Sequence, residues 1–202
     1  MELAKFLHLV PRGDLWVFGY GSLMWAPEFS YEERRTGLVH GYHRALCILS
    51  SRYRGTPEKP GLVMGLCRGG SCWGMAFRVH ARRAKQVLDA LWKREMLNRV
   101  YMPRFVPVAV EGAQRVQALA FVADTEHEQF VDELDIHGRA RLVAQGVGQR
   151  GACVDYIRNT LEHMRELGVH DPHLMRILEA ARRIAAEPRT AAKRPSSRKR
   201  RA

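Results

Sequence analysis

The residue of this sequence best suited to acid–base chemistry is a glutamate near the end of a predicted helix. Glu95 lies four residues after Leu91 and seven after Leu88, so the helical repeat brings its carboxyl group onto the apolar face of its own helix. It also falls in the last turn, where the helix dipole disfavours an anion. Both effects would raise its pKa and suit it to act as a general acid and base. The alternative is that Glu95 is exposed, or pairs with Arg94 or Arg99.

A short apolar run that stops abruptly at glycine is the second such feature. Residues 15–25 read LWVFGYGSLMW, and a run of this kind bounded by glycine is typical of a buried strand. Glycine allows another group to approach closely, so we expect a tight loop at residues 19–22 whose amide groups face a ligand. The alternative is a plain strand and turn. A dinucleotide site is not predicted, because Met24 replaces the third glycine of that fingerprint.

Tyr156 is a third candidate, in a helix predicted at about residues 152–167. It lies one turn before Thr160, at the edge of the apolar stripe of that helix. Its hydroxyl group therefore either faces a pocket or, as a core tyrosine, reaches a backbone or surface partner.

Metal and disulfide chemistry are poorly supported. His40 and His43 are three residues apart in a strand-like segment, where such positions face opposite sides. His170 and His173 flank Pro172 at a predicted helix start, and neither pair is completed by a carboxylate to a facial ligand set. The cysteines at 47, 67, 72 and 153 form no Cys-x-x-Cys pair, so we predict reduced, buried thiols. We expect no metal and no cofactor.

The elements that must position these residues indicate one α+β domain. Strands come first, in blocks rather than in strict alternation with helices, which favours α+β over a doubly wound sheet. A hairpin is expected around Gly69-Gly70, because a glycine pair separates two apolar runs. The predicted strands are residues 15–18, 38–50, 62–67, 72–79, 104–111 and 115–123, the predicted helices are 81–97 and 130–186, and the breaks in the latter fall near 146–151 and 168–172.

The net charge of +12 is concentrated at the end of the chain. Residues 189–202 carry seven basic side chains and no acid, which leaves +5 for the rest. We therefore divide the chain into a folded domain at residues 1–187 and a basic, disordered tail at 188–202. Nucleic-acid binding is expected only weakly, through the tail. No apolar stretch is long enough to span a membrane and no signal-peptide pattern is present, so we expect a cytoplasmic protein.

Several motifs together resemble the ChaC-type γ-glutamylcyclotransferases, the glutathione-specific branch. The resemblance covers about residues 16–184. It rests on VFGYGSLMW at 17–25, on Arg54-Gly55 with Lys59-Pro60-Gly61, on Trp73-Gly74, on LWKREM at 91–96, and on Tyr156. One departure concerns position 153, where members of the family carry asparagine and this chain has Cys153.

The resemblance implies a small mixed β-barrel-like core flanked by helices and the cleavage of glutathione to 5-oxoproline and cysteinylglycine. It implies Glu95 as the catalytic acid and base. It also implies that the γ-glutamyl group is bound by Val17, Phe18, Gly19, Tyr20, Gly21, Ser22, Leu23 and Tyr156. Two alternatives stay open: a cyclotransferase for other γ-glutamyl compounds, and a non-catalytic module that binds them. The sequence does not predict the oligomeric state.

Overall fold

The centre of the molecule is a closed five-stranded barrel. The computed structural model describes residues 2–112 and 114–187. Around the barrel the strand order is β1-β3-β2-β4-β5, and a short parallel pairing of β1 with β5 closes it, at Trp16 with Ala118 and Val17 with Leu119. All other neighbours are antiparallel. The strands are β1 (Leu15–Gly19), β2 (Glu33–Ser50), β3 (Gly61–Val79), β4 (Tyr101–Val110) and β5 (Gln114–Ala123).

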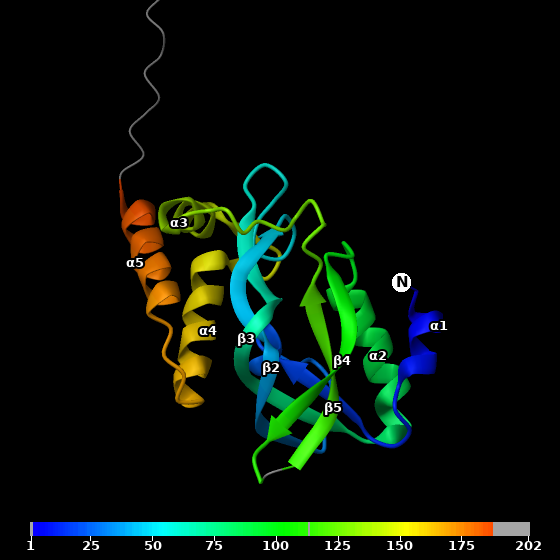
Figure 1. The fold of residues 1–202 in the computed structure, drawn as a ribbon. Helices are drawn as coiled ribbons and strands as arrows, with labels where there is room; N and C mark the ends of the chain where they lie inside the picture. The colour runs from blue at the N-terminus through cyan, green and yellow to red at the C-terminus, as the bar shows by residue number, and fades with distance from the viewer. Residues whose placement is uncertain (1, 113, 188–202) are drawn as a thin grey trace, which may run out of the picture.

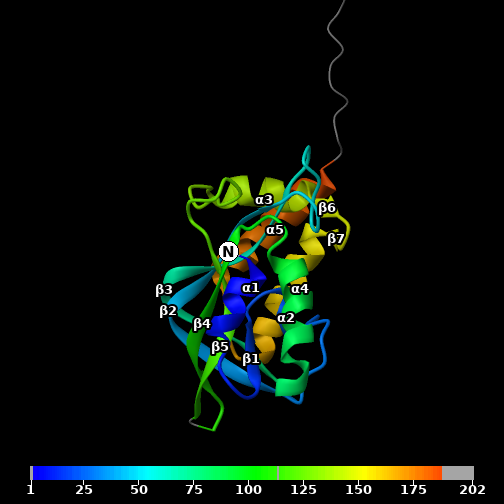
Figure 2. The same ribbon diagram turned by 90° about the vertical axis from the view of Figure 1, so that its right-hand side faces the viewer.

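Helices flank the barrel on two sides (Figures 1 and 2). On one side lie α1 and α2, and on the other lie α3, α4 and α5. The expected α+β class, with a barrel flanked by helices, is therefore confirmed. The remaining elements are α1 (Leu3–Phe6), η1 (Leu7–Leu9), η2 (Ser22–Met24), α2 (Ala81–Glu95), α3 (Ile136–Gln145), β6 (Val147–Gly148), β7 (Gly151–Ala152), α4 (Cys153–Glu166) and α5 (Pro172–Ala186).

The predicted hairpin around Gly69-Gly70 is wrong. Residues 61–79 form one strand, β3, which pairs antiparallel with β2 along almost its whole length. The register shifts between His40 and Tyr42, and Gly41, Gly69 and Gly70 all have positive φ at that point. These three glycines therefore bend a continuous ribbon instead of reversing the chain.

Two apolar clusters hold the helices to the barrel. Side chains of β1 alternate between them: Val17 packs with Leu88 and Leu91 of α2, whereas Phe18 points into the cluster shared by the barrel and α3–α5. Val17, Phe18, Leu88 and Leu91 are all buried. Helix α2 is thus fixed against β1, the strand that leads into the glycine loop. The last residues of α2 and of β1 are therefore held in fixed positions relative to each other.

The expected long helical region begins later than predicted. Residues 130–135 are not helical, and α3 starts where the Asp135 carboxylate accepts a hydrogen bond from the Gly138 N–H (2.7 Å). The predicted breaks are confirmed: the first holds the small β6–β7 hairpin, and the second ends at Asp171, which caps α5 ahead of Pro172.

The predicted basic tail at 188–202 lies outside the described residues. Across the residues that the structure describes, every helix is too short or too polar to traverse a bilayer.

Candidate active site

Glu95 is the last residue of α2. The helix is capped by His80, whose imidazole accepts a hydrogen bond from the Arg82 N–H, and it buries Val87, Leu88 and Leu91. The Glu95 side chain continues this buried face and is only 17% exposed. Burial raises its pKa above the usual value for a glutamate, and the nearby Arg94 and Arg150 partly oppose the rise. The position expected from helical periodicity is therefore confirmed.

The glycine loop joins β1 to the short turn η2. The Met24 N–H donates to the Gly21 carbonyl (2.9 Å), which closes the turn. A Cβ atom at residue 19 would lie 2.8 Å from the Cβ of Leu23, and one at residue 21 would lie 2.9 Å from the Tyr156 hydroxyl. Both positions need glycine because neighbouring groups come too close for any side chain.

Arg94 connects Glu95 to this loop. Its side chain is only 9% exposed. Nε pairs with the Glu95 carboxylate (3.0 Å), Nη2 donates to the Ser22 hydroxyl (2.9 Å), and Nη1 donates to the Ala26 carbonyl (2.7 Å) and pairs with Glu28 (3.1 Å). The pairing of Glu95 with Arg94 considered from the sequence is therefore present, but in a buried setting. One side chain fixes both the carboxylate and the loop.

Glu28 extends the network to a second arginine. Both of its carboxylate oxygens accept hydrogen bonds from Arg150, each at 2.8 Å. The Arg150 contact is the main reason that the pKa of Glu28 lies below its usual value. Glu28 also has a positive φ of 59°, an uncommon conformation for a residue other than glycine. The Glu28 carboxylate thus forms ion pairs with both Arg94 and Arg150 on one side of the site.

Three tyrosines surround the loop and the carboxylate. The Tyr20 hydroxyl donates to the Phe121 carbonyl (2.5 Å) and the Tyr101 hydroxyl donates to the Met64 carbonyl (2.9 Å). Burial raises the pKa of Tyr20, Tyr101 and Tyr156, so each stays a neutral hydroxyl group.

The Tyr156 hydroxyl accepts a hydrogen bond from the Met64 N–H (3.0 Å). The backbone partner considered from the sequence is therefore present. Tyr156 also lines the pocket, and among the described residues its hydroxyl proton has no acceptor. This proton is available to a bound ligand.

We expect Tyr156→Phe to weaken substrate binding and to lower the free energy of unfolding. The change removes a donor from the pocket and leaves the buried Met64 N–H without an acceptor, a loss of about 1–3 kcal/mol in stability. The KM for the substrate should rise about tenfold, with a smaller change in kcat. Urea unfolding and steady-state kinetics measure the two effects. A variant as stable as the parent would contradict the assigned Met64 contact.

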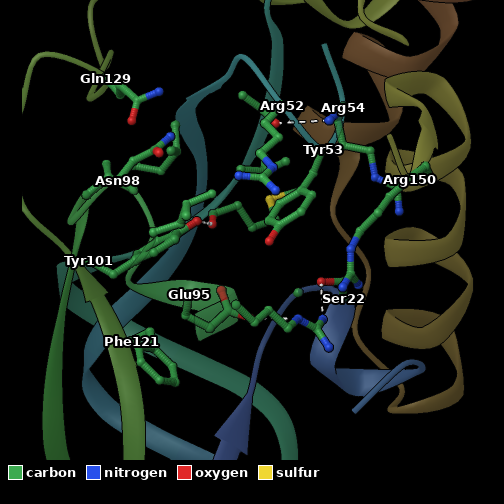
Figure 3. Close-up of a pocket in the computed structure, with 18 of the residues that line it drawn as sticks. Ser22, Arg52, Tyr53, Arg54, Glu95, Asn98, Tyr101, Phe121, Gln129 and Arg150 are labelled. Atoms are coloured by element: carbon green, nitrogen blue, oxygen red, sulfur yellow. Dashed lines mark hydrogen bonds and ion pairs between the residues drawn. The ribbon is translucent and has the colours of Figure 1, made fainter. Parts of the chain in front are cut away.

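Glu95, Arg94, Arg150, the loop and the three tyrosines lie around one open pocket (Figure 3). It occupies about 920 Å³, a volume that includes its open mouth. Its charged lining, within the described part of the chain, consists of four arginines, at 52, 54, 94 and 150, and Glu95. The pocket is thus cationic and fits a small ligand with negative charge.

The pocket unites most of the residues singled out from the sequence. Its lining includes Glu95, Tyr156 and the four consecutive loop residues Tyr20, Gly21, Ser22 and Leu23. The other three lie outside the lining: Val17, Phe18 and Gly19 are buried in β1, behind the loop.

Several lining residues, Arg52, Arg54 and Arg150 among them, were not predicted as site residues, although Arg54 belongs to one of the motifs of the family resemblance. Arg52 and Arg54 stand in a loop rich in glycine and proline, and this basic cluster was a usable signal. No pattern in the sequence indicated Arg150, because this residue reaches the pocket only through packing of the β6–β7 hairpin against the loop that follows β2. The Gln149 and Arg150 N–H groups donate to the carbonyls of Arg52 and Tyr53, each at 2.9 Å.

Cys153 lies at the start of α4 but not in the pocket lining. Its sulfur accepts a hydrogen bond from the Leu62 N–H (3.3 Å) and donates one to the Leu62 carbonyl (3.0 Å). Burial raises the pKa of this thiol to about 11. An asparagine side chain also carries one acceptor and donors, so either residue can tie α4 to β3 in this way.

The fold places the chain among proteins with a γ-glutamylcyclotransferase-like barrel. A solved structure described as a γ-glutamyl cyclotransferase specific to glutathione from yeast superposes with a TM-score of 0.80 at 19% identity, over 89% of this chain and all of that one. The model of the ChaC-like protein family matches residues 15–184, and the chain belongs to this family.

Two relatives have names that state a substrate. A glutathione-specific γ-glutamylcyclotransferase of Escherichia coli (strain K12) is 33% identical over 176 residues, which are 87% of this chain and 76% of the relative. Glutathione-specific γ-glutamylcyclotransferase 1 of Danio rerio is also 33% identical, over 84% of this chain and 89% of the relative.

Proposed function

We propose that this protein cleaves glutathione into 5-oxoproline and cysteinylglycine, with Glu95 as the general acid and base. The observation that carries the proposal is the Arg94 bridge, which holds a buried carboxylate beside the glycine loop in a cationic pocket. Family membership supports the same reaction, because relatives bear the name of this enzyme.

The reaction is an internal displacement. The α-amine of the γ-glutamyl group attacks its own γ-carbonyl carbon, the new C–N bond closes a five-membered lactam, and the amide bond to cysteine breaks. The nucleophile is tethered to its target, so little entropy is lost on the way to the transition state. The atoms of glutathione equal those of the two products, so the reaction consumes no water.

Proton transfer is the work left to the protein. The α-amine must lose a proton before or during attack, and the departing amide nitrogen must gain one. A single carboxyl group that lies between them does both, and the raised pKa of Glu95 brings its basicity nearer to that of the groups it serves. Glu95 is thus proposed to take the proton from the amine and return it to cysteinylglycine.

The loop is proposed to hold the γ-glutamyl end. The N–H of Gly21 has no acceptor within the described residues, and the first N–H groups of a turn such as η2 lack partners inside the turn. Such groups suit the α-carboxylate or the oxygen that gains charge at the γ-carbonyl. We assign ligand contact to Tyr20, Gly21, Ser22, Leu23 and Tyr156. To Val17, Phe18 and Gly19 we assign support of the loop from β1.

We propose that residues 1–187 carry the whole activity and that residues 188–202 take no part in it. We also propose that the protein is cytoplasmic. Deletion from Arg189 onward should therefore leave turnover within about twofold of the full chain. A large loss of activity would show that the tail takes part in the reaction.

An assay of the purified full chain tests the proposal. Incubation with glutathione should release 5-oxoproline and cysteinylglycine in equal amounts, measured by liquid chromatography. Parallel reactions with γ-glutamyl amino acids should be at least tenfold slower. Comparable rates would make the protein a broader cyclotransferase, and binding of glutathione without products would make it a non-catalytic module.

A further inference from the structure

Arg54 forms no ion pair with a carboxylate in the described part of the chain. No carboxylate of the described residues lies within 4.0 Å of its guanidinium nitrogens, whereas Arg94 and Arg150 both pair with Glu28. Arg54 is half-buried, and this burial lowers its pKa from the usual value for arginine. A half-buried cation without a counter-ion is unfavourable unless a ligand supplies one.

The guanidinium group of Arg54 is held in one orientation. Nη1 donates to the carbonyl oxygens of Arg150 and Ala152, at the β6–β7 hairpin. Its central carbon lies 5.2 Å from the centroid of the Tyr156 ring, within the range of a cation–π contact. Arg54 is therefore fixed from two directions before any ligand arrives.

The remaining edge of this group is free. Neither Nε nor Nη2 has an acceptor among the described residues. In the same part of the chain every buried side-chain nitrogen and oxygen has a partner, so these two nitrogens are open to solvent. Since Arg54 lines the pocket, its free edge is available there. Nε and Nη2 lie on the same side of a guanidinium group, with the spacing that two carboxylate oxygens match.

Position decides which carboxylate of the tripeptide reaches Arg54. The reacting amine and the α-carboxylate are attached to one carbon atom, so both must lie near Glu95 and the glycine loop. The carboxylate of the glycine residue is at the other end of glutathione. Figure 3 shows Arg54 well separated from Glu95, beside Arg52 and Tyr53.

We propose that Arg54 binds the glycine carboxylate of glutathione through Nε and Nη2 and thereby selects the tripeptide over shorter γ-glutamyl compounds. This inference rests on the proposed function. Arg52 also lines the pocket without a carboxylate partner, but it is exposed and its Nε donates to the Gln149 side chain (3.1 Å). It therefore contributes less to an ion pair with the ligand.

The test compares glutathione with its monoethyl ester at the glycine carboxyl group, which lacks the charge at that end. The full-length parent should have a kcat/KM about 30-fold higher for the acid than for the ester, as expected for a charge-assisted bidentate contact. Arg54→Gln should lower kcat/KM for the acid about 30-fold and change the ester little, so the preference disappears. Arg54→Lys keeps the charge without the paired donors and should retain part of the preference.

Arg52→Gln is the matched control, because it removes the same charge from the same loop. It should keep the preference of the parent for the acid within about threefold. Equal losses on both substrates in Arg54→Gln and Arg54→Lys would mean a structural role and would overturn the inference. It is also overturned if the preference disappears in Arg52→Gln instead, or if the parent does not discriminate. A parent inactive on both compounds would contradict the proposed function itself.

Discussion

Replacing Glu95 by glutamine (Glu95→Gln) is expected to reduce the release of 5-oxoproline from glutathione about 1,000-fold. The amide has nearly the same shape as the carboxyl group but cannot accept a proton from the α-amine or return one to the leaving nitrogen. The loss should appear in kcat, since the side chain is proposed to act on the reacting atoms rather than on distant parts of the substrate. Product formation by chromatography measures it directly.

The fold of this variant should survive. Glutamine gives up the ion pair with Arg94, but it also removes the unfavourable burial of a charge, and these two changes oppose each other. Thermal unfolding should confirm a cooperative transition near that of the parent. Glu128→Gln, at an exposed position, is the matched control and should retain full activity. Activity in folded Glu95→Gln close to that of the parent would rule out the assigned role.

Replacing Arg94 by glutamine (Arg94→Gln) should have the second-largest effect, about a 100-fold loss of kcat/KM at neutral pH. The variant frees the Ser22 hydroxyl, the Ala26 carbonyl and the Glu95 carboxylate from their shared partner. A displacement of the loop by about 1 Å is enough for such a loss. Stability should also fall, by about 3 kcal/mol, because a buried charge loses its partner.

The pH dependence of this variant has a defined sign. Arg94 favours the ionised form of Glu95, so its removal raises the pKa of Glu95 further. Since the base must be ionised to accept a proton, the acidic limb of the kcat/KM profile should move to higher pH than in the parent. Arg94→Lys keeps the charge and should leave the limb closer to the parent. A limb that stays in place in Arg94→Gln would mean that Glu95 does not set it.

Local patterns in the sequence indicated the position of Glu95 and Arg94 as one possible partner, but not the contacts that Arg94 makes with the loop. The helical period depends only on neighbouring residues, so it was enough to place the carboxyl group on the buried face of α2. The Arg94 bridge depends on Ser22, Ala26 and Glu28, which belong to a different part of the chain. Contacts between residues that are far apart in the chain produce no periodic pattern in the sequence.

The error at Gly69-Gly70 has a comparable cause. A pair of glycines with positive φ suits either a tight turn or a bend within a long strand. Only the partner strand distinguishes them, and here β2 continues past the bend with its own glycine at position 41. Arg54 and Arg150 likewise meet at the pocket only because the β6–β7 hairpin packs on the loop after β2.

The parallel seam between β1 and β5 links the site to the topology of the whole chain. The Tyr20 hydroxyl crosses it to reach the Phe121 carbonyl, a contact between residues 101 positions apart. The β2–β3 ribbon, in contrast, joins neighbours in the chain order. Loop-closure entropy grows slowly with the separation of the residues joined, so opening the β1–β5 pairing releases more chain entropy than opening the β2–β3 pairing. The loop follows β1 directly, and Phe121 of β5 lines the pocket together with the loop and Glu95, so the site depends on the pairing of these two strands.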